Sequence, residues 1–185
     1  MNKKELIPEV LKRINDGDTL TLLKEYVTND ALKNVFGYGF IPKGKWSLPE
    51  GTPPYKEDSG PEGMTPGNLW NETRSFDRFL RQDLSRSKRE QLFIQLLESV
   101  HPSEAKVVLA VKDQSLTEMY PNITLDKVVD AGFFIWPHGI DEVEYRAKAN
   151  GEVMKVEVPL EVTESNLPDS GSEKKSRGRP KKVIG

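Results

Sequence analysis

The stretch SKREQLFIQLLESVHPSEAKVVLAVKD, residues 87–113, decides the fold class. Apolar residues recur at helical spacing over residues 92–100, and Ser87-Lys-Arg-Glu90 fits a capping box that would open this helix. The pair His101-Pro102 then interrupts the pattern, and proline suits the first turn of a new helix. The stretch therefore predicts two consecutive helices, and the fold class is expected to be mainly α, a bundle of short helices.

The same spacing continues on both sides of this stretch. Residues 3–38 predict three short helices, the second capped by Asp18 or Thr19 and the third by Asn29. Residues 69–84 predict one further amphipathic helix. We expect a helical body over residues 1–140.

A long Pro/Gly-rich loop, residues 40–68, interrupts this body. It holds six prolines, which remove backbone donors and disfavour regular structure. Trp46, Leu48 and Tyr55 are expected to anchor the loop to the body. Basic and aromatic residues alternate here as in single-strand nucleic-acid binders, but acidic residues interrupt them, so anchoring is the preferred interpretation.

The C-terminal third follows a different pattern. Apolar and polar residues alternate over residues 154–162, and Asn150-Gly151 is a strong turn signal, so residues 141–162 predict an extended segment or a small β-hairpin. Residues 163–185 are rich in Ser, Glu, Gly, Pro and Lys and predict a disordered basic tail.

Composition excludes several classes of site. The chain has no cysteine and two histidines, which argues against disulfides, thiol catalysis and multi-histidine metal sites. His101 is interpreted as a helix cap rather than as part of a relay with Ser103 and Glu104, and His138 as a turn residue. Carboxylate pairs such as those at 141–142 could serve acid–base chemistry, but nothing distinguishes them from the other acids. We expect no enzyme, metal or cofactor, and we keep an enzyme with a dispersed carboxylate site as the third hypothesis.

The charges of the chain are segregated. The formal net charge is −2, yet residues 174–185 carry six basic groups and no acid, while the other 173 residues hold 21 basic and 29 acidic groups. Such asymmetry is typical of a tail that contacts a polyanion. The predicted nucleic-acid-binding residues are Lys174, Lys175, Arg177, Gly178, Arg179, Pro180, Lys181 and Lys182.

The segment Arg177-Gly-Arg-Pro180 resembles the AT-hook, a short DNA-binding motif. Glycine lets the backbone lie deep in a narrow groove, and proline keeps the segment extended. The arginines would then follow the A·T-rich minor groove, where negative potential is concentrated. The alternative is a basic end that acts through charge alone.

A second group of basic residues lies within residues 74–89. Arg74, Arg78 and Arg81 would share one face of the predicted helix, with Arg86, Lys88 and Arg89 close behind. This could form a phosphate-contacting surface. Acidic residues are interleaved at pairing distance, so a solvated, ion-paired face is the preferred interpretation.

Three ordered stretches resemble uncharacterised proteins of large contractile-tailed phages, including phages of cyanobacteria. They are Trp46-Ser-Leu-Pro-Glu-Gly-Thr-Pro-Pro-Tyr55; Arg89–Glu98 with His101-Pro102, Glu104-Ala105 and Ala110–Asp113; and Tyr120 with Ile123-Thr124 and Val128–Ala131. The resemblance covers about residues 30–135 and implies a phage gene product in an infected bacterium. It implies no catalytic residues. The resemblance leads us to expect a proline-containing turn after the last of these stretches, whereas this chain has Gly132-Phe-Phe134 there.

The favoured hypothesis is a non-enzymatic, DNA-associated accessory protein. Its tail would contact an A·T-rich DNA duplex, and its acidic body would contact an unknown protein partner. The protein would act in the cytoplasm of the host, at the nucleoid. No apolar run approaches the ~20 residues that span a bilayer, so no membrane association is expected. The alternative is a phage assembly, virion or interaction protein with a merely electrostatic tail.

Overall fold

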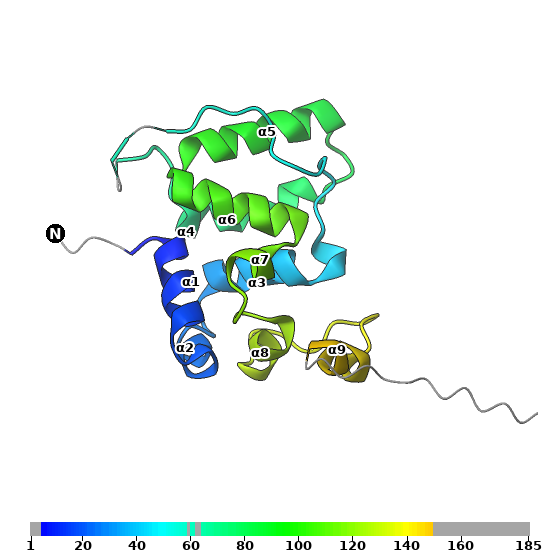
Figure 1. Ribbon diagram of the computed structural model, residues 1–185. Coiled ribbons are helices and arrows are strands. Elements are labelled where there is room, and N and C mark those ends of the chain that lie inside the picture. Colours follow the sequence, from blue (N-terminus) through cyan, green and yellow to red (C-terminus); the bar gives the residue numbers. More distant parts are fainter. Residues whose placement is uncertain (1–4, 59, 62–63, 150–185) are drawn as a thin grey trace, which may run out of the picture. The chain divides into compact units, whose positions relative to one another are not determined.

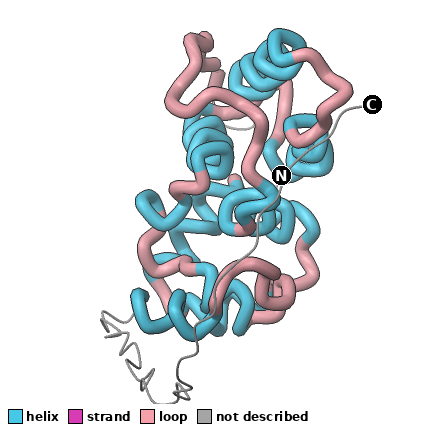
Figure 2. Tube along the Cα trace, turned by 90° about the vertical axis from the view of Figure 1, so that its right-hand side faces the viewer, coloured by secondary structure: helices cyan, strands magenta, loops and turns pink. Residues whose placement is uncertain are grey.

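The chain is mainly α-helical, as its sequence predicts. The computed structural model describes residues 5–58, 60–61 and 64–149, and in these residues Figure 2 shows helices and loops without a strand. The elements of this part of the chain are α1 (Ile7–Asp16), α2 (Thr19–Glu25), α3 (Asp30–Phe40), η1 (Pro42–Gly44), α4 (Leu69–Glu72), η2 (Thr73–Phe79), α5 (Arg86–Ser99), α6 (Pro102–Asp113), α7 (Leu116–Met119), α8 (Leu125–Asp130) and α9 (Glu142–Ala149).

Helix α6 is the centre of the packing. It contacts α1, α3, α5 and α7, and it lies beside α5 in Figure 1. Its residues Ala105, Val107, Val108, Ala110 and Val111 are all buried. A helix that is apolar on nearly every side needs neighbours all round, and this explains its central place.

The first three helices form as expected. The side chain of Asp18 accepts a hydrogen bond from the Thr21 amide at 3.4 Å and caps α2. The side chain of Asn29 accepts one from the Leu32 amide at 3.1 Å and caps α3. Asp18 rather than Thr19 is therefore the cap of the second helix.

Helix α5 begins two residues earlier than predicted. Ser85, not Ser87, is its N-cap, and the Ser85 hydroxyl accepts a hydrogen bond from the Lys88 amide at 3.3 Å. The predicted capping box at Ser87 is wrong. The apolar periodicity locates the helix well but locates its first turn poorly, because both serines can cap.

The predicted helix over residues 69–84 is also wrong in part. The chain forms one α-turn in α4, continues as the 3-10 helix η2, and leaves helical geometry after Leu80. The Thr73 and Ser75 hydroxyls donate to the carbonyls of residues three positions earlier, at 3.4 and 2.8 Å, and such local bonds compete with regular α-helix. Residues 81–84 form an irregular segment that leads into α5.

Residues 142–149 form helix α9 and not the first strand of the predicted hairpin. The Asp141 carboxylate accepts a hydrogen bond from the Glu144 amide at 2.9 Å, which caps the helix. Arg146 pairs with Glu142 one turn earlier at 3.0 Å and with Asp130 at 2.8 Å. The Asp141 cap and the Arg146–Glu142 pair are local bonds that favour helix over the alternating pattern. The second predicted strand and the basic tail lie outside the described residues.

Helix α8 ends at a glycine. Gly132 has φ +95°, and the Gly132 and Phe133 amides donate to the Val129 and Val128 carbonyls at 2.8 and 3.3 Å. This is the hydrogen-bond pattern of a Schellman cap, which favours glycine. The glycine cap makes the turn here, where the phage resemblance leads one to expect proline.

Candidate functional site

The predicted DNA-binding residues lie outside the part of the chain that the structure describes. They run from Lys174 to Lys182 in the tail, so their role stays a prediction. The described residues contain other candidate sites, all of them on the helical body.

The basic residues around 74–89 do not form a free cationic surface. Arg78 pairs with Glu72 at 3.7 Å, Arg81 with Asp83 at 2.5 Å, and Arg86 with Glu90 at 2.7 Å. The prediction of an ion-paired face is confirmed for these three arginines. The charges of these three arginines are therefore balanced by neighbouring carboxylates.

Arg89 is a structural cation rather than a surface one. Only 6% of it is exposed, and its guanidinium donates to the carbonyls of Ser47 at 2.8 Å, Arg81 at 2.7 Å and Leu84 at 3.0 Å. It therefore ties α5 both to the Pro/Gly-rich loop and to the segment that precedes the helix. The suggestion that Arg89 contacts phosphates is wrong.

A second buried cation holds the same loop. The Lys112 side chain is 1% exposed, pairs with the Asp113 carboxylate, and donates to the Pro49 carbonyl at 2.9 Å. Arg89 of α5 and Lys112 of α6 thus each donate to a carbonyl of the loop, and these carbonyls are only two residues apart. Neither role can be predicted from the sequence, because buried and solvated basic residues look alike there.

Aromatic packing completes the loop's attachment. Trp46 is 3% exposed, and its ring centroid lies 4.6 Å from that of Phe79 and 4.8 Å from that of Phe76. Leu48 and Tyr55 pack against the same core. The interpretation of these three residues as anchors is confirmed, and in Figure 1 the loop runs along α5.

His101 caps α6, as interpreted from the sequence. Its Nδ1 accepts a hydrogen bond from the Ser103 amide at 3.3 Å and lies 2.8 Å from the Ser103 hydroxyl oxygen. The third member of the imagined relay, Glu104, is buried, and its carboxylate accepts a hydrogen bond from the Leu69 amide at 3.3 Å instead. Burial raises the pKa of the Glu104 carboxyl.

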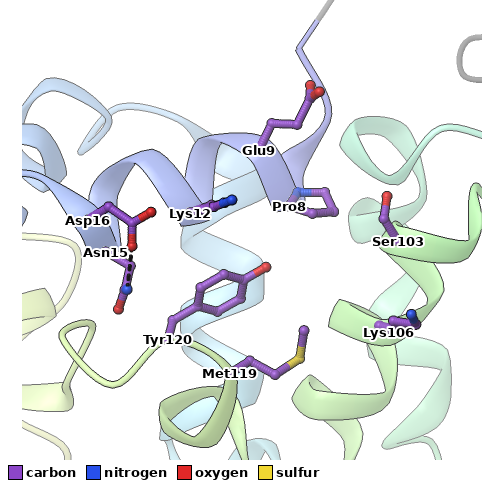
Figure 3. Close-up of a pocket in the computed structure, with 9 residues that line it drawn as sticks. All are labelled: Pro8, Glu9, Lys12, Asn15, Asp16, Ser103, Lys106, Met119 and Tyr120. Atoms are coloured by element: carbon purple, nitrogen blue, oxygen red, sulfur yellow. Dashed lines mark hydrogen bonds between the residues drawn. The ribbon is translucent and has the colours of Figure 1, made fainter.

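A surface hollow of about 420 Å³ lies between α1 and α6 and is closed on one side by α7 and Tyr120 (Figure 3). Its lining residues are Pro8, Glu9, Lys12, Asn15, Asp16, Ser103, Lys106, Met119 and Tyr120. The sequence carries no signal of this hollow. The residues come from three segments that extend from Pro8 to Tyr120, and no local motif connects them.

Tyr120 is the most deeply placed polar group of this hollow. It is 7% exposed, and in Figure 3 its hydroxyl points into the space between α1 and α6. The hydroxyl forms no hydrogen bond to any described residue. Burial raises the pKa of Tyr120 to about 12, so the phenol is protonated at neutral pH and can donate.

Two lysines approach the same space from facing helices. Lys12 of α1 and Lys106 of α6 form no ion pair with other described residues. The two acids of the lining are engaged locally: Glu9 accepts from the Leu6 amide at 2.8 Å, and Asp16 accepts from the Asn15 side-chain amide at 3.0 Å. The lining therefore carries two ammonium groups and two carboxylates, so its formal charges balance.

Two negative observations concern the described residues alone. They contain no group of three or more His, Cys, Asp or Glu side chains placed to hold a metal ion. None of their helices is long and apolar enough to cross a membrane.

Comparison with known proteins gives one match. A family model described as "Family of unknown function (DUF6433)" matches residues 7–118, which is more than half of the chain. No curated protein and no solved structure matches. The matched range includes Lys12 and Lys106 and ends two residues before Tyr120.

Proposed function

The chain belongs to this family of unknown function, DUF6433, and we propose that it is a non-enzymatic, phage-encoded accessory protein held on A·T-rich DNA by its tail. Its acidic body contacts a protein partner. The phage origin is supported by the ordered stretches around Trp46, Arg89 and Tyr120, which resemble proteins of large contractile-tailed phages. The proposed place of action is the cytoplasm of the infected bacterium, at the nucleoid.

The observation that carries the proposal is the segregation of charge. Residues 174–185 hold six basic groups without an acid, while the rest of the chain has an excess of eight acidic groups. On the body, several basic residues are paired with acids or buried, as Arg81 and Arg89 are. A polyanion is therefore attracted to the tail far more than to the body.

The proposed contact uses each residue of the Arg-Gly-Arg-Pro segment. Gly178 allows the backbone to approach the groove floor, and Pro180 keeps the segment extended. Arg177 and Arg179 follow the narrow minor groove, and the flanking lysines meet phosphates. An acidic body is repelled by the duplex and faces away from it, where a protein partner can reach it.

The test compares the full chain with the double variant Arg177→Ala/Arg179→Ala in duplex binding. The matched control is Arg74→Ala/Arg86→Ala, which removes two exposed arginines from the body. We expect the tail variant to lose A·T-rich binding and the control to keep it. If the six basic residues of the tail together neutralise six phosphates, the parent chain should show a log–log salt slope of about −5.

Three outcomes would contradict parts of the proposal. Equal affinity for A·T- and G·C-rich duplexes would refute the minor-groove contact. Equal loss in both double variants would refute the role of the tail. Recovery of the protein in purified virions, with no DNA binding, would favour the alternative role in assembly.

A further inference from the structure

Helix α9 is attached to the helical body outside the hydrophobic core. None of its described side chains belongs to that core, and the last described side chain that packs against the core is that of Phe134. Residues 142–144 are exposed, whereas Tyr145 and Arg146 are half-buried. Tyr145 and Arg146 are therefore the side chains of α9 that turn toward the body.

Arg146 fastens α9 to α8, which lies beside it in Figure 1. Its guanidinium donates to both oxygens of the Asp130 carboxylate, at 2.8 and 3.2 Å, and its Cζ lies 5.4 Å from the centroid of the Trp136 ring. The side chains of Arg146 and Asp130 are 33% and 43% exposed, so water and salt reach the pair. Exposed ion pairs of this kind are weak and are screened by salt.

The docked position of α9 has an electrostatic cost. The Oδ1 atom of Asp126, in the first turn of α8, is buried and forms no hydrogen bond with any described residue. Tyr145 lies close to this carboxylate, because burial and then the negative charge of Asp126 raise the pKa of the phenol. A buried carboxylate oxygen without a partner is unfavourable, and release of α9 would let water reach it.

The segment before α9 provides a hinge. Gly139 has φ +93°, and a Cβ at this position would meet nothing within 4 Å. The turn around it is held by the Ile140 amide, which donates to the Pro137 carbonyl at 3.3 Å, and by Trp136 Nε1, which donates to the Ile140 carbonyl at 2.9 Å. A glycine in an uncrowded turn can change its backbone angles without disturbing the core.

We propose that α9 is a salt-sensitive cover on the first turn of α8, docked through Arg146 and released by rotation at Gly139. In the docked state Arg146 is held by Asp130 and the ring of Trp136. In the released state water reaches Asp126 while the core of the body stays folded, so that release precedes global unfolding. This cover belongs to the described part of the chain and does not rest on DNA binding by the tail.

The test is hydrogen exchange of the full chain, followed by mass spectrometry on peptides from α9 and α6. We expect the amides of α9 to exchange far faster than those of α6, because release of α9 leaves the core intact. Raising the ionic strength from about 0.05 M to about 0.5 M should speed exchange in α9 about twofold and leave α6 unchanged, since salt screens the exposed pair.

Two substitutions on α8 should act in opposite directions. Asp130→Asn removes the charge that holds Arg146 and should speed exchange in α9 about threefold. Asp126→Ala removes the buried oxygen without a partner and should slow exchange in α9 about threefold. The matched control is Asp83→Asn, which removes the partner of another exposed arginine, Arg81, and should leave α9 unchanged.

Four outcomes would overturn the proposal. Exchange in α9 as slow as in α6 would show that α9 unfolds only with the core. Equal exchange in α9 at both ionic strengths, or equal rates in Asp130→Asn and Asp83→Asn, would show that the ion pair does not hold the helix. Faster exchange in Asp126→Ala would show that the docked state bears no cost there. Asp130 is exposed, and the ionic-strength comparison uses the unaltered chain, so a variant that fails to fold leaves the test intact.

Discussion

Replacement of Arg89 by methionine tests how the Pro/Gly-rich loop is held. Methionine keeps most of the aliphatic length of the side chain but donates no hydrogen bond. It removes three bonds, to the carbonyls of Ser47, Arg81 and Leu84, whose lengths lie between 2.7 and 3.0 Å. The rest of α5 is left unchanged.

The magnitude follows from the surroundings of these carbonyls. A hydrogen bond from a charged donor contributes about 1.5–3 kcal/mol, and three such bonds on one group are not additive. Ser47 and Arg81 lie in exposed segments, so water can replace part of what is lost. We therefore expect Arg89→Met to lower the free energy of unfolding by about 2–4 kcal/mol.

The matched control is Arg86→Met on the same helix. Arg86 is exposed, and its one ion pair is with Glu90, four residues along. Removal of such a pair costs less than about 0.5 kcal/mol. Both variants would be measured by urea unfolding, with far-UV circular dichroism for the helices and tryptophan fluorescence for the surroundings of Trp46. Free energies of unfolding that agree within about 0.5 kcal/mol would refute the claim that Arg89 holds the loop.

Two further perturbations test the core. Gly39→Ala should lower the free energy of unfolding by about 1–3 kcal/mol, because the added methyl carbon would lie 2.2 Å from Leu116 Cδ1. The control Gly37→Ala, on the same helix, meets nothing within 4 Å and should be neutral or stabilising. Equal thermal midpoints of the two variants would contradict this packing. Burial raises the pKa of Glu104. Between the ordinary glutamate pKa and this raised pKa, the folded chain therefore binds more protons than the unfolded chain. The free energy of unfolding should fall as the pH rises through this range. Glu104→Gln should flatten that part of the stability–pH profile, and a profile parallel to that of the parent chain would show that Glu104 does not titrate there.

The elements that were predicted correctly are those for which two local sequence signals agree. Two independent signals agree for α6, which has apolar periodicity and proline in its first turn. The loop anchors were also predictable, because Trp46 and Tyr55 are large apolar groups in a segment without regular structure. In such cases sequence and tertiary packing favour the same outcome.

The failures occur where two local preferences compete. Residues 142–149 alternate as a strand would, but capping by Asp141 and the pairing of Arg146 with Asp130 favour helix. The pairing with Asp130 depends on tertiary structure and cannot be found from spacing. The same limit applies to Arg89 and Lys112, whose acceptors in the loop, the carbonyls of Ser47 and Pro49, lie 42 and 63 residues earlier in the chain.

The hollow was unpredictable for a related reason. Lys12, Lys106 and Tyr120 are ordinary residues in their local sequences, and only the packing of α1 against α6 brings them together. No spacing rule links them. The unpaired state of each group is visible only when every neighbour is known.

The two cations that fasten the loop have a consequence for protein synthesis. The ribosome makes Trp46 before it makes Arg89 and Lys112, so the loop cannot be held by both cations until α6 has been made. Until α6 is complete, the nascent chain carries an open segment with a large aromatic side chain. Such a chain exposes apolar surface on which chaperones act until α6 is complete.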